Sequence, residues 1–211
     1  MFWNKTNFIT KSLPFYDALV NKINCHYVWK CNEKHIFEHY LKNIGRNHLE
    51  IGPGTGYFLQ RRYPISHLIL MDINKDTLDY TSDNLKGNYP HISVMEHDIF
   101  KKPKRFDRVQ SVGINYVLHC VPGRLDTKLE SLVNNIHVGR DTTFFGATVI
   151  QDDTNQNFLS KTELYLLNKY KIFHNQNDYI RNGIDVFEKH GFSYDYNQIG
   201  NVFLFSFKKK S

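Results

Sequence analysis

The stretch EIGPGTGYFL, residues 50–59, decides the fold of this 211-residue chain. It continues from a short apolar run, HLEIG, that predicts a buried strand. Three glycines, Gly52, Gly54 and Gly56, then let the backbone turn sharply and approach a ligand closely. A glycine-rich turn that leaves a strand is typical of sheets that bind ligands beyond the carboxyl ends of their strands.

The charge and spacing of this turn narrow the class of ligand. Glu50 stands two residues before the first glycine, and the spacing is G-x-G-x-G instead of the G-x-G-x-x-G of dinucleotide sites. A carboxylate at this place repels a pyrophosphate and suits a cationic or ammonium-bearing ligand. This disfavours one alternative, a nicotinamide-dependent oxidoreductase. A glycine-rich turn without any ligand is a further alternative.

Strands and helices alternate along the rest of the chain. Asn74 suits the N-cap of one helix, and Gly200-Asn201 predicts a tight turn between two final strands, FSYDYNQI and NVFLFSFK. This order predicts an α/β fold with a mostly parallel sheet and helices on both faces. Strands are predicted over 48–52, 67–73, 91–100, 107–114 and 142–150, and helices over 14–24, 32–43, 55–62, 74–85, 124–137, 156–173 and 177–190.

Acidic residues follow the second and third predicted strands. Asp72 lies about 20 positions after Glu50, where an acidic residue binds the hydroxyl groups of a ribose. The alternative is that Asp72 only caps the next helix. Asp98 is suited to accept a hydrogen bond from an exocyclic adenine amine, with Ile99 and Phe100 covering the ring.

Four segments together carry a resemblance to a known family. EIGPGTGYFL, MDIN (71–74), HDIF (97–100) and FDRVQSVGINYVLHCVPG (106–123) resemble the class I S-adenosylmethionine-dependent methyltransferases, most of all their small-molecule branch. The resemblance runs from about Tyr16 to Phe207. It implies a Rossmann-like seven-stranded, mostly parallel sheet with an antiparallel C-terminal hairpin. It also implies S-adenosylmethionine as cofactor and S-adenosylhomocysteine as product.

The resemblance also implies roles for individual residues. Glu50 and the glycines would line the methionine and ribose parts of the cofactor, Asp72 the ribose hydroxyls, and Asp98 with Ile99 the adenine. No N/D-P-P-Y/F element follows the fourth strand, which speaks against the branches that methylate DNA adenine or glutamine. The full predicted cofactor-binding set is Glu50, Gly52, Gly54, Gly56, Asp72, Ile73, Asp98, Ile99, Gly113 and Trp29.

The segment after the fourth strand would face the transferred methyl group. Methyl transfer is an in-line displacement from an activated donor, so the protein mainly supplies alignment. A base is needed only if the acceptor must lose a proton. His119 is the candidate base, and Asn115 and Tyr116 would orient the acceptor. The alternatives are a hydrogen-bonded structural histidine and packing at the strand end. No metal ligand set is predicted.

The N-terminal segment is predicted to form a helical cap. Residues 1–45 would cover the site, and residues 46–211 would form the methyltransferase core of one compact domain. Trp29 and its aromatic neighbours would exclude water or stack on a flat or cationic group. Ordinary helix packing is the alternative for these side chains.

Composition limits the partners. Hydrophobic residues make up 41% and charged residues 23%, and no run approaches the roughly 20 apolar residues of a membrane span. Three cysteines predict reduced thiols in a cytoplasmic compartment. The net charge of +6 favours a small, anionic acceptor, and the dispersed lysines make nucleic acid an unlikely partner. An RNA or protein methyltransferase and a catalytically inactive binding module remain alternatives.

Overall fold

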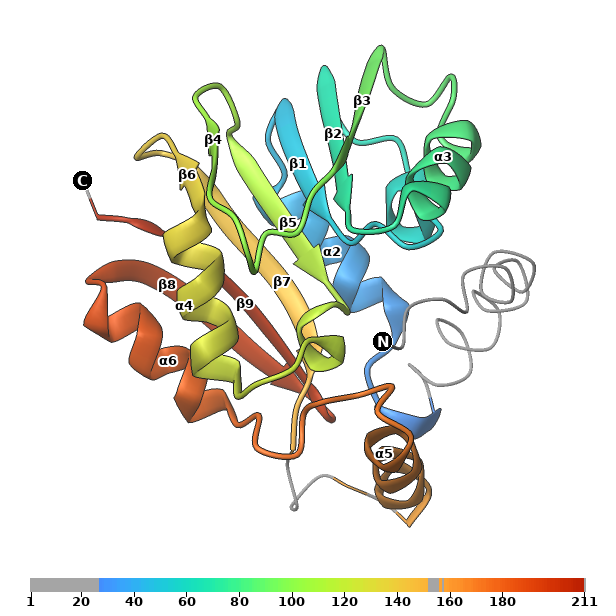
Figure 1. The fold of residues 1–211 in the computed structure, drawn as a ribbon, viewed down its shortest axis with the longest axis vertical. Coiled ribbons are helices and arrows are strands. Elements are labelled where there is room, and N and C mark those ends of the chain that lie inside the picture. The colour runs from blue at the N-terminus through green and yellow to red at the C-terminus, as the bar shows by residue number, and fades with distance from the viewer. Residues whose placement is uncertain (1–26, 152–155, 157, 211) are drawn as a thin grey trace.

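The centre of the fold is a seven-stranded sheet in the order β3-β2-β1-β5-β7-β9-β8 (Figure 1). The computed structural model describes residues 27–151, 156 and 158–210. β9 runs antiparallel to both neighbours, and the other pairs of this sheet are parallel. The predicted Rossmann-like α/β class with its antiparallel C-terminal hairpin is confirmed. The strands are β1 (Asn47–Ile51), β2 (His67–Asp72), β3 (His91–Glu96), β5 (Ser111–Asn115), β7 (Thr143–Val149), β8 (Phe192–Ile199) and β9 (Val202–Lys209).

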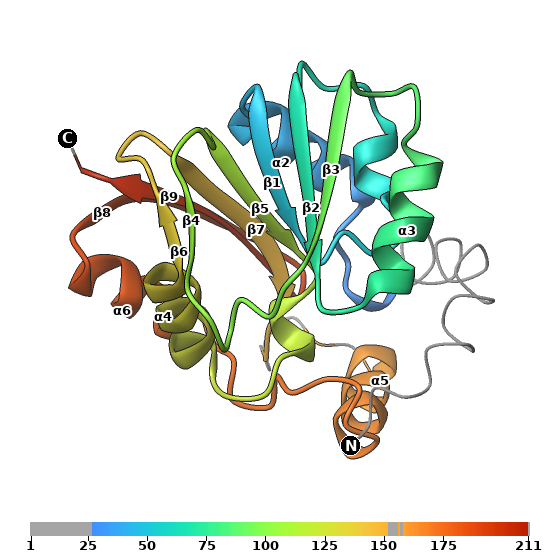
Figure 2. The same ribbon diagram turned by 45° about the horizontal axis from the view of Figure 1, so that its top comes forward.

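Helices cover both faces of the sheet, with α4 and α6 on one face and α2 on the other (Figure 2). None of the helices in the described part of the chain has the length and apolar character that a membrane crossing needs. The helices are α2 (Glu33–Asn43), α3 (Lys75–Asn84), α4 (Leu125–Asn135), α5 (Phe158–Lys169) and α6 (Ile180–Lys189), with short 3-10 helices η2 (Tyr57–Gln60) and η3 (Leu118–Cys120).

The alternation of side chains along the strands builds one hydrophobic core on each face. In β7, Phe144 belongs to the core shared with α4 and α6, whereas the next residue, Phe145, belongs to the core shared with α2, α3 and α5. Successive residues of a strand point to opposite faces, so a strand covered on both faces is apolar throughout. The continuous apolar character of the predicted strands is explained by these two cores.

Local signals in the sequence fix the ends of several elements. The side chain of Asn74 accepts a hydrogen bond from the Asp76 backbone N–H at 2.9 Å, which caps α3 as predicted. The β8–β9 turn contains Gly200 with a φ of 56°. A Cβ at Gly200 would lie 2.1 Å from the Trp29 carbonyl oxygen, so the close approach of two backbones requires glycine there.

The structure corrects four predicted boundaries. The helix over 55–62 is only the 3-10 helix η2, and the strand over 91–100 ends at Glu96. The residues around Lys104, between the strands predicted over 91–100 and 107–114, and the end of the 124–137 helix instead form two short strands, β4 (Lys104–Phe106) and β6 (Ile136–Val138), that pair with each other. This pairing joins distant segments of three residues each, which no local periodicity reveals.

The predicted N-terminal cap divides into a described and an undescribed part. α2 confirms the helix over 32–43 and packs against the sheet at β7, with Ile36, Phe37 and Tyr40 buried. The predicted helix over 14–24 lies outside the described residues. The boundary at residue 45 between cap and core stays a prediction.

Candidate functional site

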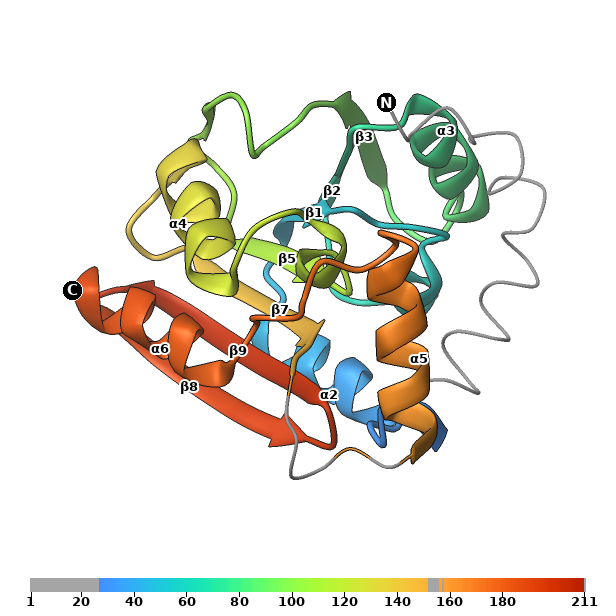
Figure 3. The ribbon, with the colours of Figure 1, turned by 60° about the horizontal axis from the view of Figure 1, so that its bottom comes forward.

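The predicted site residues gather at the carboxyl ends of neighbouring strands. Ile51 at the end of β1 pairs with Met71 of β2 and with Ile114 of β5, so the segments that follow these three strands lie side by side. Figure 3 turns this edge toward the viewer and shows α5 beside it. In open parallel sheets this edge is where ligands bind.

The glycine turn after β1 is held by contacts with α3 and is open at its middle glycine, Gly54. Gly52, Gly54 and Gly56 all have positive φ, at 64°, 56° and 78°. The Thr81 hydroxyl of α3 donates to the Gly54 carbonyl. A Cβ at Gly52 would lie 2.4 Å from Val117 Cγ2, whereas a Cβ at Gly54 would meet nothing within 4 Å. The turn is therefore fixed on one side and accessible at Gly54.

Glu50, in β1 just before this turn, is a buried and hydrogen-bonded carboxylate. It is 2% exposed, and its two oxygens accept hydrogen bonds from the Tyr40 hydroxyl at 2.6 Å and from His48 Nε2 at 2.8 Å. Gly113 of β5 leaves room for it, because a Cβ there would lie 2.3 Å from Glu50 Oε2. Glu50 and Gly113 are thus directly opposed, as their register in β1 and β5 requires.

Asp72 ends β2 and stands at the rim of the site. Its Oδ1 accepts the Asn74 backbone N–H at 2.8 Å, so it helps to shape the start of α3. Burial raises the pKa of Asp72, and backbone N–H groups partly oppose this rise. The next residue, Ile73, is 44% exposed. An exposed apolar side chain beside a carboxylate offers one surface for a ring and one acceptor for hydroxyl groups.

Asp98 and Ile99 follow β3 and differ in their exposure to solvent. Asp98 is half-buried, accepts the Phe100 backbone N–H at 3.0 Å and forms an ion pair with Lys101 at 2.9 Å. Ile99 is only 3% exposed and belongs to the core shared with α4 and α6. Asp98 is therefore the more accessible of the two toward a ligand.

Tyr116 follows β5 in an unusual backbone conformation. Its φ is 56°, which costs free energy in a residue with a bulky side chain. Its backbone N–H donates to the Ala147 carbonyl at 2.7 Å, and its ring stacks on Phe58 with centroids 6.0 Å apart. Strain of this kind concentrates at functional sites, because surrounding contacts must hold it in place.

His119 is enclosed by packing and by hydrogen bonds. Its Nδ1 accepts the Val149 backbone N–H at 3.3 Å and lies 3.3 Å from Thr148 Oγ1. Its ring lies 4.2 Å from that of Phe173. Burial, with a smaller contribution from the charge of Lys128, lowers the pKa of His119 to about 3. A neutral imidazole with this pKa is a weak proton acceptor, so the geometry favours the structural alternative.

Trp29 belongs to the core and not to an exposed cap. It is 2% exposed and packs against Phe173 with ring centroids 6.0 Å apart. Its carbonyl accepts the Asn201 backbone N–H at 2.9 Å. The structure therefore places Trp29 against the β8–β9 turn, in the core shared with α2 and α5.

A second buried polar cluster was not predicted. Lys128 of α4 and Asp178 before α6 are 1% and 0% exposed and form an ion pair at 2.6 Å. Lys128 also donates to the His174 carbonyl at 2.9 Å, and Asn175 donates to the Val149 carbonyl at 3.0 Å. Burial raises the pKa of Asp178 to about 6, and Lys128 limits this rise. The signal that could have revealed this cluster is Lys128 within LDTKLESL, because it is a charged residue at a helix position that faces the core together with the leucines.

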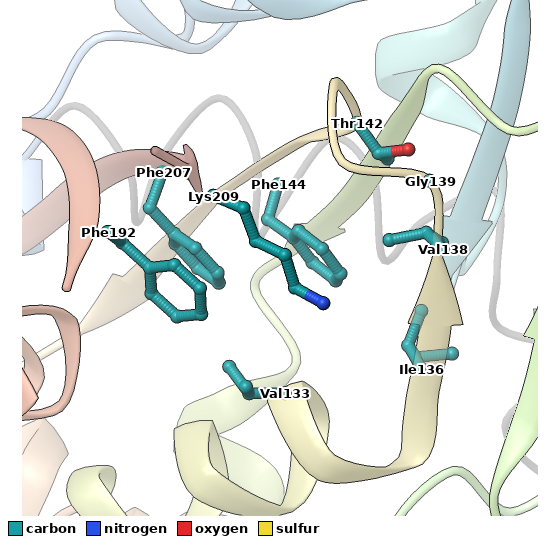
Figure 4. Close-up of a pocket in the computed structure, with 9 residues that line it drawn as sticks. All are labelled: Val133, Ile136, Val138, Gly139, Thr142, Phe144, Phe192, Phe207 and Lys209. Carbon is teal, nitrogen blue, oxygen red and sulfur yellow. The ribbon is translucent and has the colours of Figure 1, made fainter. Parts of the chain in front are cut away.

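A small apolar hollow lies at the opposite end of the strands, where β7 begins. Figure 4 shows Phe144, Phe192 and Phe207 around it, with the side chain of Lys209 across its mouth. None of the predicted site residues lines it. The hollow is therefore separate from the candidate site.

The residues at the carboxyl edge fit the expected cofactor. S-adenosylmethionine carries a sulfonium, an ammonium and a ribose but no phosphate, so acidic side chains attract it. Glu50 supplies a buried negative charge, and Asn115 Oδ1 is a buried acceptor with no hydrogen-bond partner in the described structure. The space at Gly54 allows a close approach to the backbone. An anionic, open edge of this kind suits a cationic nucleoside.

Known proteins support this interpretation. No family model matches the chain. The demethylluteothin O-methyltransferase of Streptomyces thioluteus is 34% identical over 174 residues, which cover 80% of this chain and 75% of that protein. The methyltransferase ctvB of Aspergillus terreus is 27% identical over 93% of this chain and 90% of its own length.

A solved structure has the same fold. The DhpI-SAM-HEP complex superposes with a TM-score of 0.63 at 13% identity and covers 98% of this chain and 96% of its own. The match to the Streptomyces enzyme and the seven-stranded sheet with its single antiparallel strand agree with each other. The chain therefore belongs to the class I S-adenosylmethionine-dependent methyltransferases, in their small-molecule branch.

Proposed function

We propose that the protein transfers a methyl group from S-adenosylmethionine to a small, anionic acceptor that is methylated on oxygen. One observation carries the cofactor part of this proposal: Glu50 near the end of β1, Asp72 at the end of β2 and Asp98 after β3 belong to three adjacent strands and lie at one edge of the sheet. An edge with three carboxylates disfavours a phosphorylated cofactor and favours a cationic one. The oxygen acceptor follows the name of the Streptomyces relative.

Individual residues receive roles in this proposal. Glu50 and the open turn at Gly54 would hold the methionine part, Asp72 the ribose hydroxyls, and Ile73 with Asp98 the adenine. The bound cofactor supplies an activated methyl group and a thioether leaving group. The chain itself supplies alignment and excludes water, with Tyr116 held in position at the end of β5 by Phe58 and by the Ala147 carbonyl.

The environment of His119 supports the proposal of an anionic acceptor. With a pKa lowered to about 3, His119 is poorly suited to take a proton at neutral pH. An acceptor that ionises without help, such as a carboxylic acid or an acidic phenol, needs no protein base. The net charge of +6 attracts such a molecule. We include a cytoplasmic, reducing location in the proposal, which the free thiol of Cys120 supports.

Transfer of a labelled methyl group tests this function. The full chain is incubated with methyl-labelled S-adenosylmethionine and separate pools of small aromatic acids and phenols, small amines, RNA and protein. The proposal expects label in products of the acids and phenols, released by ester or ether cleavage. Label confined to RNA or protein would contradict the small acceptor, and cofactor binding without transfer to any pool would favour an inactive binding module.

A further inference from the structure

A row of hydrogen-bonded polar side chains is buried between the sheet and α2. It consists of Ser111, His48, Glu50, Tyr40 and Asn115, which we call the buried polar row. His48 pairs with Ser111 in the sheet register, and Glu50 pairs with Gly113. Alternate residues of a strand share a face, so His48 and Glu50 of β1 lie beside Ser111, Gly113 and Asn115 of β5. Tyr40 reaches this face from α2.

The hydrogen bonds of the row have one consistent direction. Ser111 Oγ accepts the Gly45 backbone N–H at 2.8 Å, so its own proton is available for His48 Nδ1, also at 2.8 Å. His48 then donates from Nε2 to Glu50 Oε2 at 2.8 Å. The Tyr40 hydroxyl donates to the other oxygen, Oε1, at 2.6 Å. Both oxygens of Glu50 are thereby fixed by hydrogen-bond donors.

Glu50 has no lysine or arginine partner within the described chain. Its Oε2 faces His48 Nε2 at 2.8 Å, and its Oε1 faces the Tyr40 hydroxyl at 2.6 Å. A carboxylate that is 2% exposed is costly without a cation. A row that holds such a charge with several hydrogen bonds is therefore suited to a cationic ligand group.

Asn115 supplies a second acceptor beside Glu50. The hydroxyl of Tyr40 has one proton, which Glu50 receives, so the Asn115 amide must donate to the Tyr40 oxygen, at 3.0 Å. This fixes the orientation of the amide. Asn115 Oδ1 is then left without a partner although the residue is 6% exposed. Unpaired buried acceptors are rare, and a ligand donor accounts for this one.

We propose that Tyr40 and His48 are positioning residues that hold Glu50 Oε1 and Oε2 and Asn115 Oδ1 ready for the ammonium group of the cofactor's amino-acid end. This inference rests on the proposed function. Tyr40 has the central place, because its single hydroxyl joins both acceptors. Ser111 acts from further away, through the tautomer of His48.

Two ligands that differ only at the amino-acid end test this role. S-adenosylhomocysteine and 5′-methylthioadenosine share the nucleoside and the thioether, but only the first carries an ammonium group. Affinities of the wild type and of Tyr40→Phe are measured for both by titration calorimetry. We expect Tyr40→Phe to lower the affinity for S-adenosylhomocysteine by roughly ten- to a hundredfold, as for a lost hydrogen bond to a charged group. The affinity for methylthioadenosine should fall by less than about twofold.

The neighbouring tyrosine provides a matched control. Tyr63 stacks on Tyr40 with centroids 5.5 Å apart, is buried, and has a hydroxyl without a partner in the described structure. Tyr63→Phe removes the same atom from the same environment, so it should leave both affinities unchanged. An equal loss for both ligands in Tyr40→Phe, no loss for either, or the same selective loss in Tyr63→Phe would overturn the inference.

A second variant covers the case in which Tyr40→Phe does not fold. Ser111→Ala removes the donor to His48 together with the acceptor of the Gly45 backbone N–H, so its melting temperature should fall while it still unfolds cooperatively. We expect its affinity for S-adenosylhomocysteine to fall selectively, by about threefold. Equal affinities of Ser111→Ala and wild type for both ligands would then overturn the role of the row. If the folded wild type binds neither ligand, the proposed function fails, which differs from a wild type that binds both while the variants show no selectivity.

Discussion

The two halves of the carboxyl edge use polar side chains in opposite ways. Around β1 and β2, Glu50 and Asp72 form no ion pair with a lysine or arginine in the described chain, and the backbone is open at Gly54. Around η3 and α4, Lys128 neutralises Asp178 at 2.6 Å, and His119 is packed against Phe173. The carboxylates of the first half are therefore available to a cationic ligand, whereas the buried carboxylate of the second half is paired with a lysine of the same chain.

The contrast distinguishes side chains that are available to bind the cofactor from side chains that hold elements of the fold together. Lys128 joins α4 to the segment between α5 and α6 through Asp178 and the His174 carbonyl. His119 joins η3 to β7 through Val149. These contacts hold together the segments that follow β5 and β7. We therefore expect substitutions in the second half to affect folding, and substitutions in the first half to affect cofactor affinity.

The largest effect is expected where the second half loses one charge. Lys128→Met leaves Asp178 buried without its partner, which should lower the free energy of unfolding by about 3–5 kcal/mol in denaturant titration at neutral pH. Lys42→Met is the control, because its ion pair with Asp195 is exposed and should cost less than about 1 kcal/mol. Lys128→Met with Asp178→Leu should recover most of the loss. Equal stability of Lys128→Met and wild type would remove the contrast.

The next effect concerns the pH dependence of stability. His119 has a pKa near 6.5 when unfolded and about 3 when folded. As the pH falls below 6.5, the unfolded chain takes up a proton that the folded chain does not. Stability is therefore lost by up to about 1.4 kcal/mol per pH unit toward pH 3.

Replacement of this histidine checks the prediction. His119→Gln should reduce that slope in denaturant titrations between pH 6 and 4, while the exposed His137→Gln should not. An unchanged slope together with a large loss of turnover would instead support the role of His119 as base.

In the first half, the expected effect is on the ligand. Asp72→Ala should weaken the binding free energy of S-adenosylhomocysteine by about 1–3 kcal/mol, because a charged acceptor for the ribose hydroxyls is lost. Asp76→Ala removes an exposed carboxylate in the first turn of α3 and should leave the affinity unchanged. Calorimetry measures both. The ribose role of Asp72 is wrong if the two variants bind alike.

The smallest effect is expected at the open glycine. Gly54→Ala places a methyl group where no protein atom lies within 4 Å, at a φ of 56°. Stability should fall by about 1 kcal/mol from backbone strain, and S-adenosylhomocysteine should bind about fivefold more weakly. Gly87→Ala has similar strain and similar open space away from the site, so it should show the first effect without the second. Comparable affinities in both variants would mean that the ligand does not approach Gly54.

The sequence predicted the first half of the edge better than the second because its signals are local. Glu50 lies near the end of β1, Gly52 directly follows this strand, and Asp72 ends β2, so their positions at one edge come from the strand order alone. The same holds for the hairpin at Gly200. Tertiary contacts decided the rest: Trp29 and Ile99 are buried in the two cores, which no local pattern showed.

Partners that are distant in the chain could not be predicted. The β4–β6 pairing, the Lys128–Asp178 ion pair and the contact between Tyr40 and Glu50 each join segments without a shared local pattern. His48 and Ser111 did carry a signal, since polar residues alternate with apolar ones in HLEI and SVGIN. A buried strand with one polar face predicts a hydrogen-bonded row, so this alternation is a local signal of the row.

Binding of S-adenosylhomocysteine by the wild-type chain tests the central claim most directly. Titration calorimetry of the folded protein should give saturable binding at one site per chain, with NADH producing no binding under the same conditions. Saturable binding of NADH, with no binding of S-adenosylhomocysteine by protein that melts cooperatively, would contradict the account.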